Sequence, residues 1–294
     1  MQIAANGLSI EIDDQGPPGG EPLLLIMGLG MQLVAWPQEL VDLLVARGFR
    51  VIRLDNRDAG LSQGFDDRGA PSIALAALRY ALHLPVKSPY SIGDMAGDAL
   101  GVLDALGLQR AHVCGASMGG MIAQHLAARH PQRVKSLTLM MTTSGSRKLP
   151  QPSLAVQRAL LKKPADNSPE AAAERLQGLL GVIGSPGYPS DPAELRRRLL
   201  ANAHRANRPV GTLRQLLAVA ADGDRSTLLP RIQAPTRVIH GQADPLIPVA
   251  CGHDLVARIA GAQIDAVPGM GHDLPLPLLE RFADGMRDNA ARAR

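Results

Sequence analysis

Short apolar runs bounded by turn residues alternate along this chain with longer segments of helical period. In the segments between the runs, apolar residues recur three or four positions apart, as they do on one face of an amphipathic helix. Strands alternating with helices predict a mainly parallel sheet covered by helices on both faces. The strand-like runs in the first half of the chain are residues 22–28, 50–55, 111–117 and 134–142.

The alternation is interrupted between residues 143 and 229. This stretch has helical period, is punctuated by SPGYPSDP and NRPVG, and contains no convincing strand. Strand-like runs then resume at 235–241 and 262–269. We therefore expect one α/β core domain, formed by residues 1–142 and 230–294. A helical cap of residues 143–229 is inserted after the sixth strand of an eight-stranded sheet.

The positive charge of the chain is concentrated in the expected cap. Residues 143–229 hold 13 Lys or Arg against 7 Asp or Glu, whereas the whole chain has a net charge of only +4. This excess could attract anionic substrates or an anionic surface, but we interpret it as a solvated helical face, because Arg196, Arg197 and Arg198 are consecutive and must splay around a helix. Aromatic residues make up 2% of the chain, too few for the stacking platforms of nucleic-acid binders.

No segment approaches the run of about 20 apolar residues that a membrane-spanning helix needs. The first residues also lack the basic and apolar regions of an export signal. Cys114 and Cys251 have no metal-ligand spacing, and we expect both to be reduced and buried. The sequence thus predicts a cytoplasmic protein without a membrane or nucleic-acid partner, either a monomer or a homodimer.

The stretch GASMGG at residues 115–120 lies between a strand-like run and a helical segment. Gly115 to Gly119 match G-x-S-x-G, a motif in which a sharp turn exposes the serine hydroxyl above the strand end. An ordinary turn with a helix-capping serine would have the same pentapeptide. The choice between them depends on whether Ser117 has a base and an acid as partners.

Partners for Ser117 occur in the positions where this architecture needs them. A serine nucleophile requires a base, and the base requires an acid that orients its ring. Asp244 follows the strand-like run 235–241, and His272 follows the next one, which gives the order Ser, Asp, His. We therefore predict Ser117, Asp244 and His272 as the catalytic residues. Other histidines, among them His125 beside the elbow, have no acid placed near them in the sequence.

Acyl transfer also needs backbone donors for an oxyanion. The N–H of Met118 directly follows the nucleophile and is the first candidate. The second should come from the loop after the run 22–28, where we assign Leu29 as the donor with Gly28 as the alternative. For the substrate pocket we consider Gly30, Trp36 and Leu246, together with apolar residues of the cap. Trp36 fits the core or the pocket wall better than a stacking contact with a ligand.

These motifs together resemble the α/β-hydrolase superfamily over the whole chain: GASMGG, GQADPLIP, VPGMGH and RLDNRDAGLS. The stretches IMGLGMQLVAW, LDNRDAGLS and PGMGHDLP further resemble the aclacinomycin methylesterase-like group of bacterial carboxylesterases. That resemblance implies a serine esterase of small or medium carboxylic esters. The loop Met-Gly-Leu-Gly departs from the Met-Gly-Gly-Asn frequent in that group, which would place the Leu29 side chain in the pocket floor. We expect the run at residues 55–58 to brace the loops beneath the site through charge-assisted bonds.

The expected reaction is acyl transfer to Ser117 followed by hydrolysis, with a small-molecule ester as the partner. No metal or organic cofactor is expected, because the sequence has no Cys/His cluster or phosphate-binding loop. A lactonase, a C–C bond hydrolase or a perhydrolase would use the same three residues, as would an acyltransferase. A receptor that binds a small ligand with negligible turnover is the alternative from a different class.

Overall fold

The computed structural model describes residues 1–293, so residue 294 at the end of the predicted core domain lies outside it. It confirms the expected sheet of eight strands in the order β1-β2-β4-β3-β5-β6-β7-β8. Strands β1 and β2 pair antiparallel, as do β2 and β4, and all other neighbours are parallel. The strands are β1 (Gln2–Ala5), β2 (Leu8–Gln15), β3 (Glu21–Ile26), β4 (Phe49–Leu54), β5 (Ala111–Ala116), β6 (Val134–Met140), β7 (Thr236–Gly241) and β8 (Gln263–Val267).

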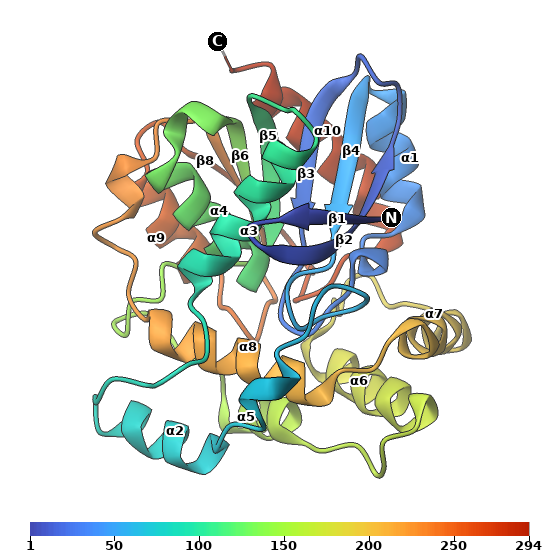
Figure 1. Cartoon of the computed structure of the whole chain (residues 1–294), viewed down its shortest axis with the longest axis vertical. Helices are drawn as coiled ribbons and strands as arrows, with labels where there is room; N and C mark the ends of the chain where they lie inside the picture. The colour runs from blue at the N-terminus through green and yellow to red at the C-terminus, as the bar shows by residue number, and fades with distance from the viewer. Residues whose placement is uncertain (294) are drawn as a thin grey trace.

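Both faces of the sheet are buried, as parallel sheets require. Along β3, Leu24 and Ile26 join the core on one face, while Leu23 and Leu25 join the core on the other. Helices α3 (Ile92–Ala105), α4 (Met118–Arg129) and α9 (Ala250–Arg258) cover the first face. Helices α1 (Gln38–Ala46) and α10 (Leu279–Ala290) cover the second (Figure 1).

Four α-helices, one short 3-10 helix (Leu229–Arg231) and no strand lie between β6 and β7, all within the described residues. The α-helices are α5 (Leu154–Leu161), α6 (Pro169–Ile183), α7 (Pro192–Arg205) and α8 (Pro209–Asp222), and they lie below the sheet in Figure 1. Ser168 and Asp191 cap α6 and α7, each followed by a proline at the first helical position. A further helix, α2 (Ile73–Ala81), lies on the same side of the molecule.

Both cysteines, Cys114 and Cys251, are free and buried. Among the described residues, no helix is long and apolar enough to cross a membrane.

Candidate active site

Ser117 lies on a sharp turn between β5 and α4. Its φ of 54° is left-handed, a conformation that non-glycine residues seldom adopt. The turn is possible because glycines flank it: a Cβ on Gly115 would come within 2.2 Å of the Gly119 carbonyl oxygen, and one on Gly119 within 2.0 Å of the Ile26 carbonyl oxygen. Within residues 111–128, Ser117 alone is not fully buried. The strained turn thus presents one hydroxyl at the carboxyl end of the sheet.

His272 and Asp244 complete a chain of hydrogen bonds from this hydroxyl. The Ser117 Oγ is 3.1 Å from Nε2 of His272, and Nδ1 of His272 is 2.7 Å from Oδ2 of Asp244. An ionised carboxylate can only accept, so Nδ1 carries the proton and leaves Nε2 of the neutral ring as an acceptor for the serine. The other Asp244 oxygen accepts the N–H groups of Leu246 and Ile247, at 2.9 and 2.8 Å. The Asp244 carboxylate is therefore fixed by its own turn.

The loop that carries His272 is fastened to the end of cap helix α6. The His272 N–H donates to the Ile183 carbonyl at 2.7 Å, and the Gly271 N–H donates to Ser185 Oγ at 2.8 Å. Ser185 in turn donates to Asp273, whose pKa is raised because burial disfavours its charge. The position of His272 thus depends on the cap as well as on the sheet.

The loop after β3, which carries the candidate oxyanion donors Gly28 and Leu29, lies beside Ser117. Gly28 to Met31 form a turn closed by the Met31 N–H and the Gly28 carbonyl at 3.2 Å, with Gly30 at φ 68°. A Cβ on Gly28 would lie 3.1 Å from the Ser117 Cβ, a contact tighter than ordinary packing, so glycine leaves more room beside Ser117 than any other residue would. Within residues 1–293, neither the Leu29 N–H nor the Met118 N–H donates a hydrogen bond to a backbone or side-chain acceptor. Both amides are available to a substrate oxygen.

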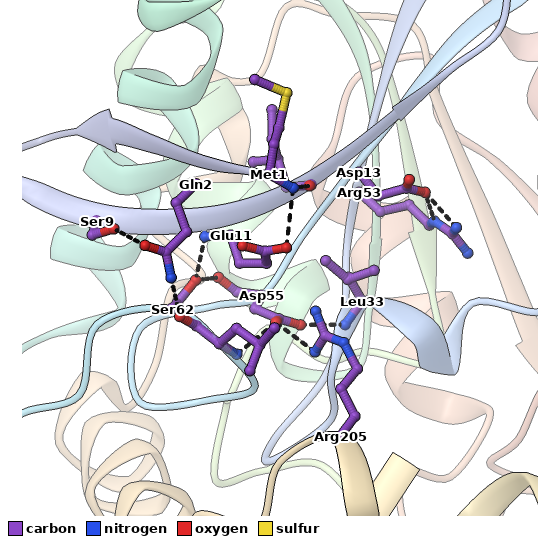
Figure 2. A network of polar contacts seen from close by, with 12 residues as sticks. Met1, Gln2, Ser9, Glu11, Asp13, Leu33, Arg53, Asp55, Ser62 and Arg205 are labelled. Carbon is purple, nitrogen blue, oxygen red and sulfur yellow. Dashed lines mark hydrogen bonds and ion pairs between the residues drawn. The ribbon is translucent and has the colours of Figure 1, made fainter. Parts of the chain in front are cut away.

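The acidic run after β4 braces these loops. Asp55 is fully buried, and Figure 2 shows its carboxylate between Leu33 and Arg205. It accepts the Leu33 N–H at 2.6 Å, the Leu61 N–H at 2.9 Å and Nη1 of Arg205, from α7, at 2.7 Å. One carboxylate thereby joins the segment after the oxyanion turn to a cap helix.

Asp58 forms a second ion pair between this run and a cap helix. Arg214 of α8 donates to both of its oxygens, at 2.8 and 2.7 Å, and only 1% of Arg214 is exposed. Burial alone would raise the pKa of Asp58, but hydrogen bonds from Arg214, the Phe65 N–H and Tyr90 hold it below its usual value. The bracing role expected for this run therefore agrees with its contacts.

The three pocket candidates have different surroundings. Gly30 is held by the cap, because its N–H donates to Oε1 of Gln215 at 2.8 Å and its Cα faces Thr212. Leu246 is half-buried beside Asp244. Trp36 has no exposed surface and packs in the core under α1 with Leu40 and other apolar residues. Trp36 thus packs as a core residue, one of the two placements, core or pocket wall, that the sequence leaves open.

Sequence reasoning missed several polar contacts that reach the site from the cap. Gln215 is fully buried; besides accepting from Gly30, it donates to the Arg57 carbonyl at 2.7 Å. His125 does have an acidic partner, Asp222 at the end of α8, at 2.8 Å. Partners so far apart in the chain have no local signal.

No group of three or more His, Cys, Asp or Glu side chains gathers as metal ligands would anywhere in residues 1–293.

Comparison with known proteins places this chain among hydrolases. Residues 21–275 match the family model described as the alpha/beta hydrolase fold. The chain is 33% identical to rhodomycin D methylesterase DnrP of Streptomyces peucetius, over 91% of this chain and 90% of that protein. It is 30% identical to 2-hydroxymuconate semialdehyde hydrolase of Pseudomonas sp. strain CF600, over 99% and 94%. The structure resembles the enol-lactonase of Burkholderia xenovorans LB400 with a TM-score of 0.72 and 25% identity, over 99% and 100%.

Proposed function

Because the chain belongs to the α/β-hydrolase family, we propose that this hydrolytic enzyme cleaves carboxylic esters of small to medium-sized molecules through Ser117, His272 and Asp244. The observation that carries the proposal is the unbroken contact chain from the Ser117 hydroxyl through the His272 ring to the Asp244 carboxylate. A serine on a strained turn with an oriented imidazole beside it has the arrangement that nucleophilic catalysis requires.

In the first half-reaction, Nε2 of His272 takes the proton from Ser117 as its oxygen attacks the ester carbonyl. The tetrahedral intermediate collapses when the imidazolium returns that proton to the departing alkoxide, which leaves as an alcohol. In the second half, His272 deprotonates a water that attacks the acyl-serine, and the acid leaves as Ser117 regains its proton. Asp244 remains ionised throughout and stabilises the imidazolium.

The charge that develops on the carbonyl oxygen needs donors that are already in place. We assign this role to the N–H groups of Leu29, in the loop after β3, and of Met118, at the start of α4. Met118 opens α4, so the partial positive charge of that helix terminus adds to its N–H. Gly28 keeps the space beside the nucleophile open.

The relatives support an ester as the scissile group. Two of them, at 33% identity over most of both chains, are named as methylesterases. A C–C bond hydrolase is the second candidate, because the semialdehyde hydrolase relative aligns with 99% of this chain. The same serine, histidine and oxyanion donors would serve both reactions.

The test is hydrolysis of p-nitrophenyl esters of graded acyl length by the wild type and by Ser117→Ala. We expect kcat/KM to fall at least about 10⁴-fold in the variant. Ser72→Ala, at the exposed start of α2, is the control and should change the rate less than about twofold. Including 2-hydroxymuconate semialdehyde in the panel decides between the two candidates. Equal, negligible rates of the wild type and Ser117→Ala on the whole panel would overturn the proposal.

A further inference from the structure

Helix α2 and the segment after it expose apolar side chains that no part of the described chain covers. No residue of α2 is buried. The exposed fractions are 54% for Leu75, 55% for Leu78, 59% for Leu82 and 48% for Leu84. A helix so rich in leucine normally turns such a face toward a core or a partner.

A second exposed apolar segment adjoins it. On α5, Leu154 and Leu161 are 69% and 60% exposed, and Val156 alone is buried. Arg147, in the chain leading to α5, stacks over the Tyr80 ring of α2 at 4.4 Å and contacts His83. We call residues 68–93 together with 143–165 the outer face; both segments lie at the cap side of the molecule in Figure 1.

The charge of the outer face is of one sign. Its first segment holds Arg68, Arg79 and Lys87 and no Asp or Glu, and of these Arg68 pairs at 3.2 Å with Asp67, just outside the segment. The second segment likewise has no Asp or Glu, and its basic residues are Arg147, Lys148, Arg158, Lys162 and Lys163. Exposed leucines among Lys and Arg, without a single carboxylate, are typical of surfaces that lie on anionic lipid.

Two other occupants fit this face less well. A second copy of the chain would bring two like-charged surfaces together, with no carboxylate in either segment to pair with the other's cations. A nucleic acid would find cations but only two exposed rings, Tyr80 and His83, for stacking on this face. An anionic lipid surface accepts both the leucines and the cations.

We propose that the outer face docks this enzyme peripherally on membranes that contain anionic lipid. The leucines of α2 and α5 enter the headgroup region, and the surrounding Lys and Arg contact the negatively charged headgroups. The sequence-based expectation of no membrane partner rested on the lack of a spanning segment or export signal, which does not bear on a peripheral contact. The proposal is independent of the ester chemistry.

The test is co-sedimentation of the full chain with vesicles of phosphatidylcholine alone or mixed with phosphatidylglycerol. We expect binding to the mixed vesicles only, with loss of binding at high salt. Lys162→Gln with Lys163→Gln should weaken binding about thirtyfold, since each basic residue near the surface contributes roughly fivefold. Leu75→Ser with Leu78→Ser should weaken it at least about tenfold.

Matched controls separate this face from general charge and hydrophobicity. Arg196→Gln with Arg197→Gln removes two exposed cations on α7, and Leu276→Ser removes an exposed leucine elsewhere. Both should bind as the wild type does, and all variants should hydrolyse a water-soluble ester at the wild-type rate. Equal affinity for neutral and mixed vesicles, or no binding to either, would overturn the proposal. A wild-type dimer that the leucine variant converts to a monomer would instead identify the face as an interface between copies.

Discussion

The helices on the cap side of the molecule are attached to the core in two different ways. We call α7 and α8 the inner part, and α2 and α5 the outer part. Helices α7 and α8 are joined to the core by buried charged and polar groups, of which Arg205 with Asp55, Arg214 with Asp58, and Gln215 with the Gly30 N–H are the clearest. Helix α2 buries no residue and α5 buries one. The carboxylates that take part in the inner ties come directly after β4, from the same loops that support the oxyanion turn.

This difference indicates that the inner helices belong to the structural support of the site, whereas the outer ones form a surface. A buried ion pair is sensitive to removal of one partner, because the other charge is left in a poor solvent. An exposed leucine loses little when it is replaced. Substitutions should therefore separate the two parts by stability, by catalysis and by pH dependence.

The largest effect is expected for Arg214→Met. It leaves the Asp58 carboxylate buried without its cation, which should lower the free energy of unfolding by about 3–5 kcal/mol. Urea denaturation measures this, with Arg197→Met as the exposed control.

Asp58→Asn added to Arg214→Met should restore much of the loss, because the buried charge is removed and asparagine tolerates the left-handed backbone at this position, φ 65°. If Arg214→Met were as stable as its exposed control, the Arg214–Asp58 ion pair would stabilise the fold less than its burial implies.

Gln215→Met should reduce kcat about tenfold to a hundredfold while KM changes less than about threefold. The substitution leaves the Gly30 N–H without an acceptor, so the adjacent Leu29 N–H should lose the direction toward the oxyanion that we propose for it. Gln215→Glu keeps an acceptor for Gly30 and should retain more of kcat than Gln215→Met.

Asn289→Leu is the matched control for Gln215. Asn289 is likewise a fully buried amide that bonds to the backbone, but its acceptors are the carbonyls of Leu137, in the middle of β6, and Pro235, just before β7. It should lose stability without a selective loss of kcat. Equal kcat losses in the two variants would indicate a general packing effect.

Acidification should weaken the contacts that hold the inner helices and leave those of the outer face unchanged. The folded-state pKa of Asp58 lies below its ordinary value of 3.8, so its contribution is complete above about pH 4 and is lost as the pH falls through the folded pKa. Each such proton gives a slope of up to about 1.4 kcal/mol per pH unit. The outer face has no carboxylate, so it makes no contribution of this kind to the pH dependence of the unfolding free energy. The check is to measure the free energy of unfolding of the wild type and of Asp58→Asn between pH 5 and 2. The wild type should lose more stability per pH unit, and identical slopes against pH would contradict the assigned role of Asp58.

The smallest effect is expected for Leu75→Ser with Leu78→Ser. Both side chains are more than half exposed, so the free energy of unfolding should change by less than about 0.5 kcal/mol. Thermal denaturation checks this. A loss of several kcal/mol would show that these leucines are covered in the folded protein and would erase the contrast between the two parts.

The sheet, the helices on its faces and the cap insertion could be predicted because their signals are local. Periodicity identifies strands and helices, and glycines mark the turn at Ser117. The placement of Asp244 and His272 after successive strands is also readable from the chain, and the two residues do converge on Ser117.

The supporting contacts could not be predicted in the same way. Gln215 reaches Gly30 across 185 residues of sequence, and Arg214 reaches Asp58 across 156. No periodicity or motif specifies such pairs, since they depend on how the cap helices dock on the sheet. The sequence left Trp36 open between core and pocket wall for a related reason: a large apolar residue near such a loop has the same sequence signal whether it faces a pocket or the core.

The most direct test of the proposed chemistry is covalent labelling of the nucleophile. The wild-type protein is treated with a fluorophosphonate, which forms a stable bond with an activated serine, and the intact mass and the modified peptide are determined. One adduct per chain, located on Ser117 and absent from both Ser117→Ala and His272→Gln, is the predicted result. An unlabelled wild type, or a label on another residue, would contradict the assignment of Ser117 as the nucleophile.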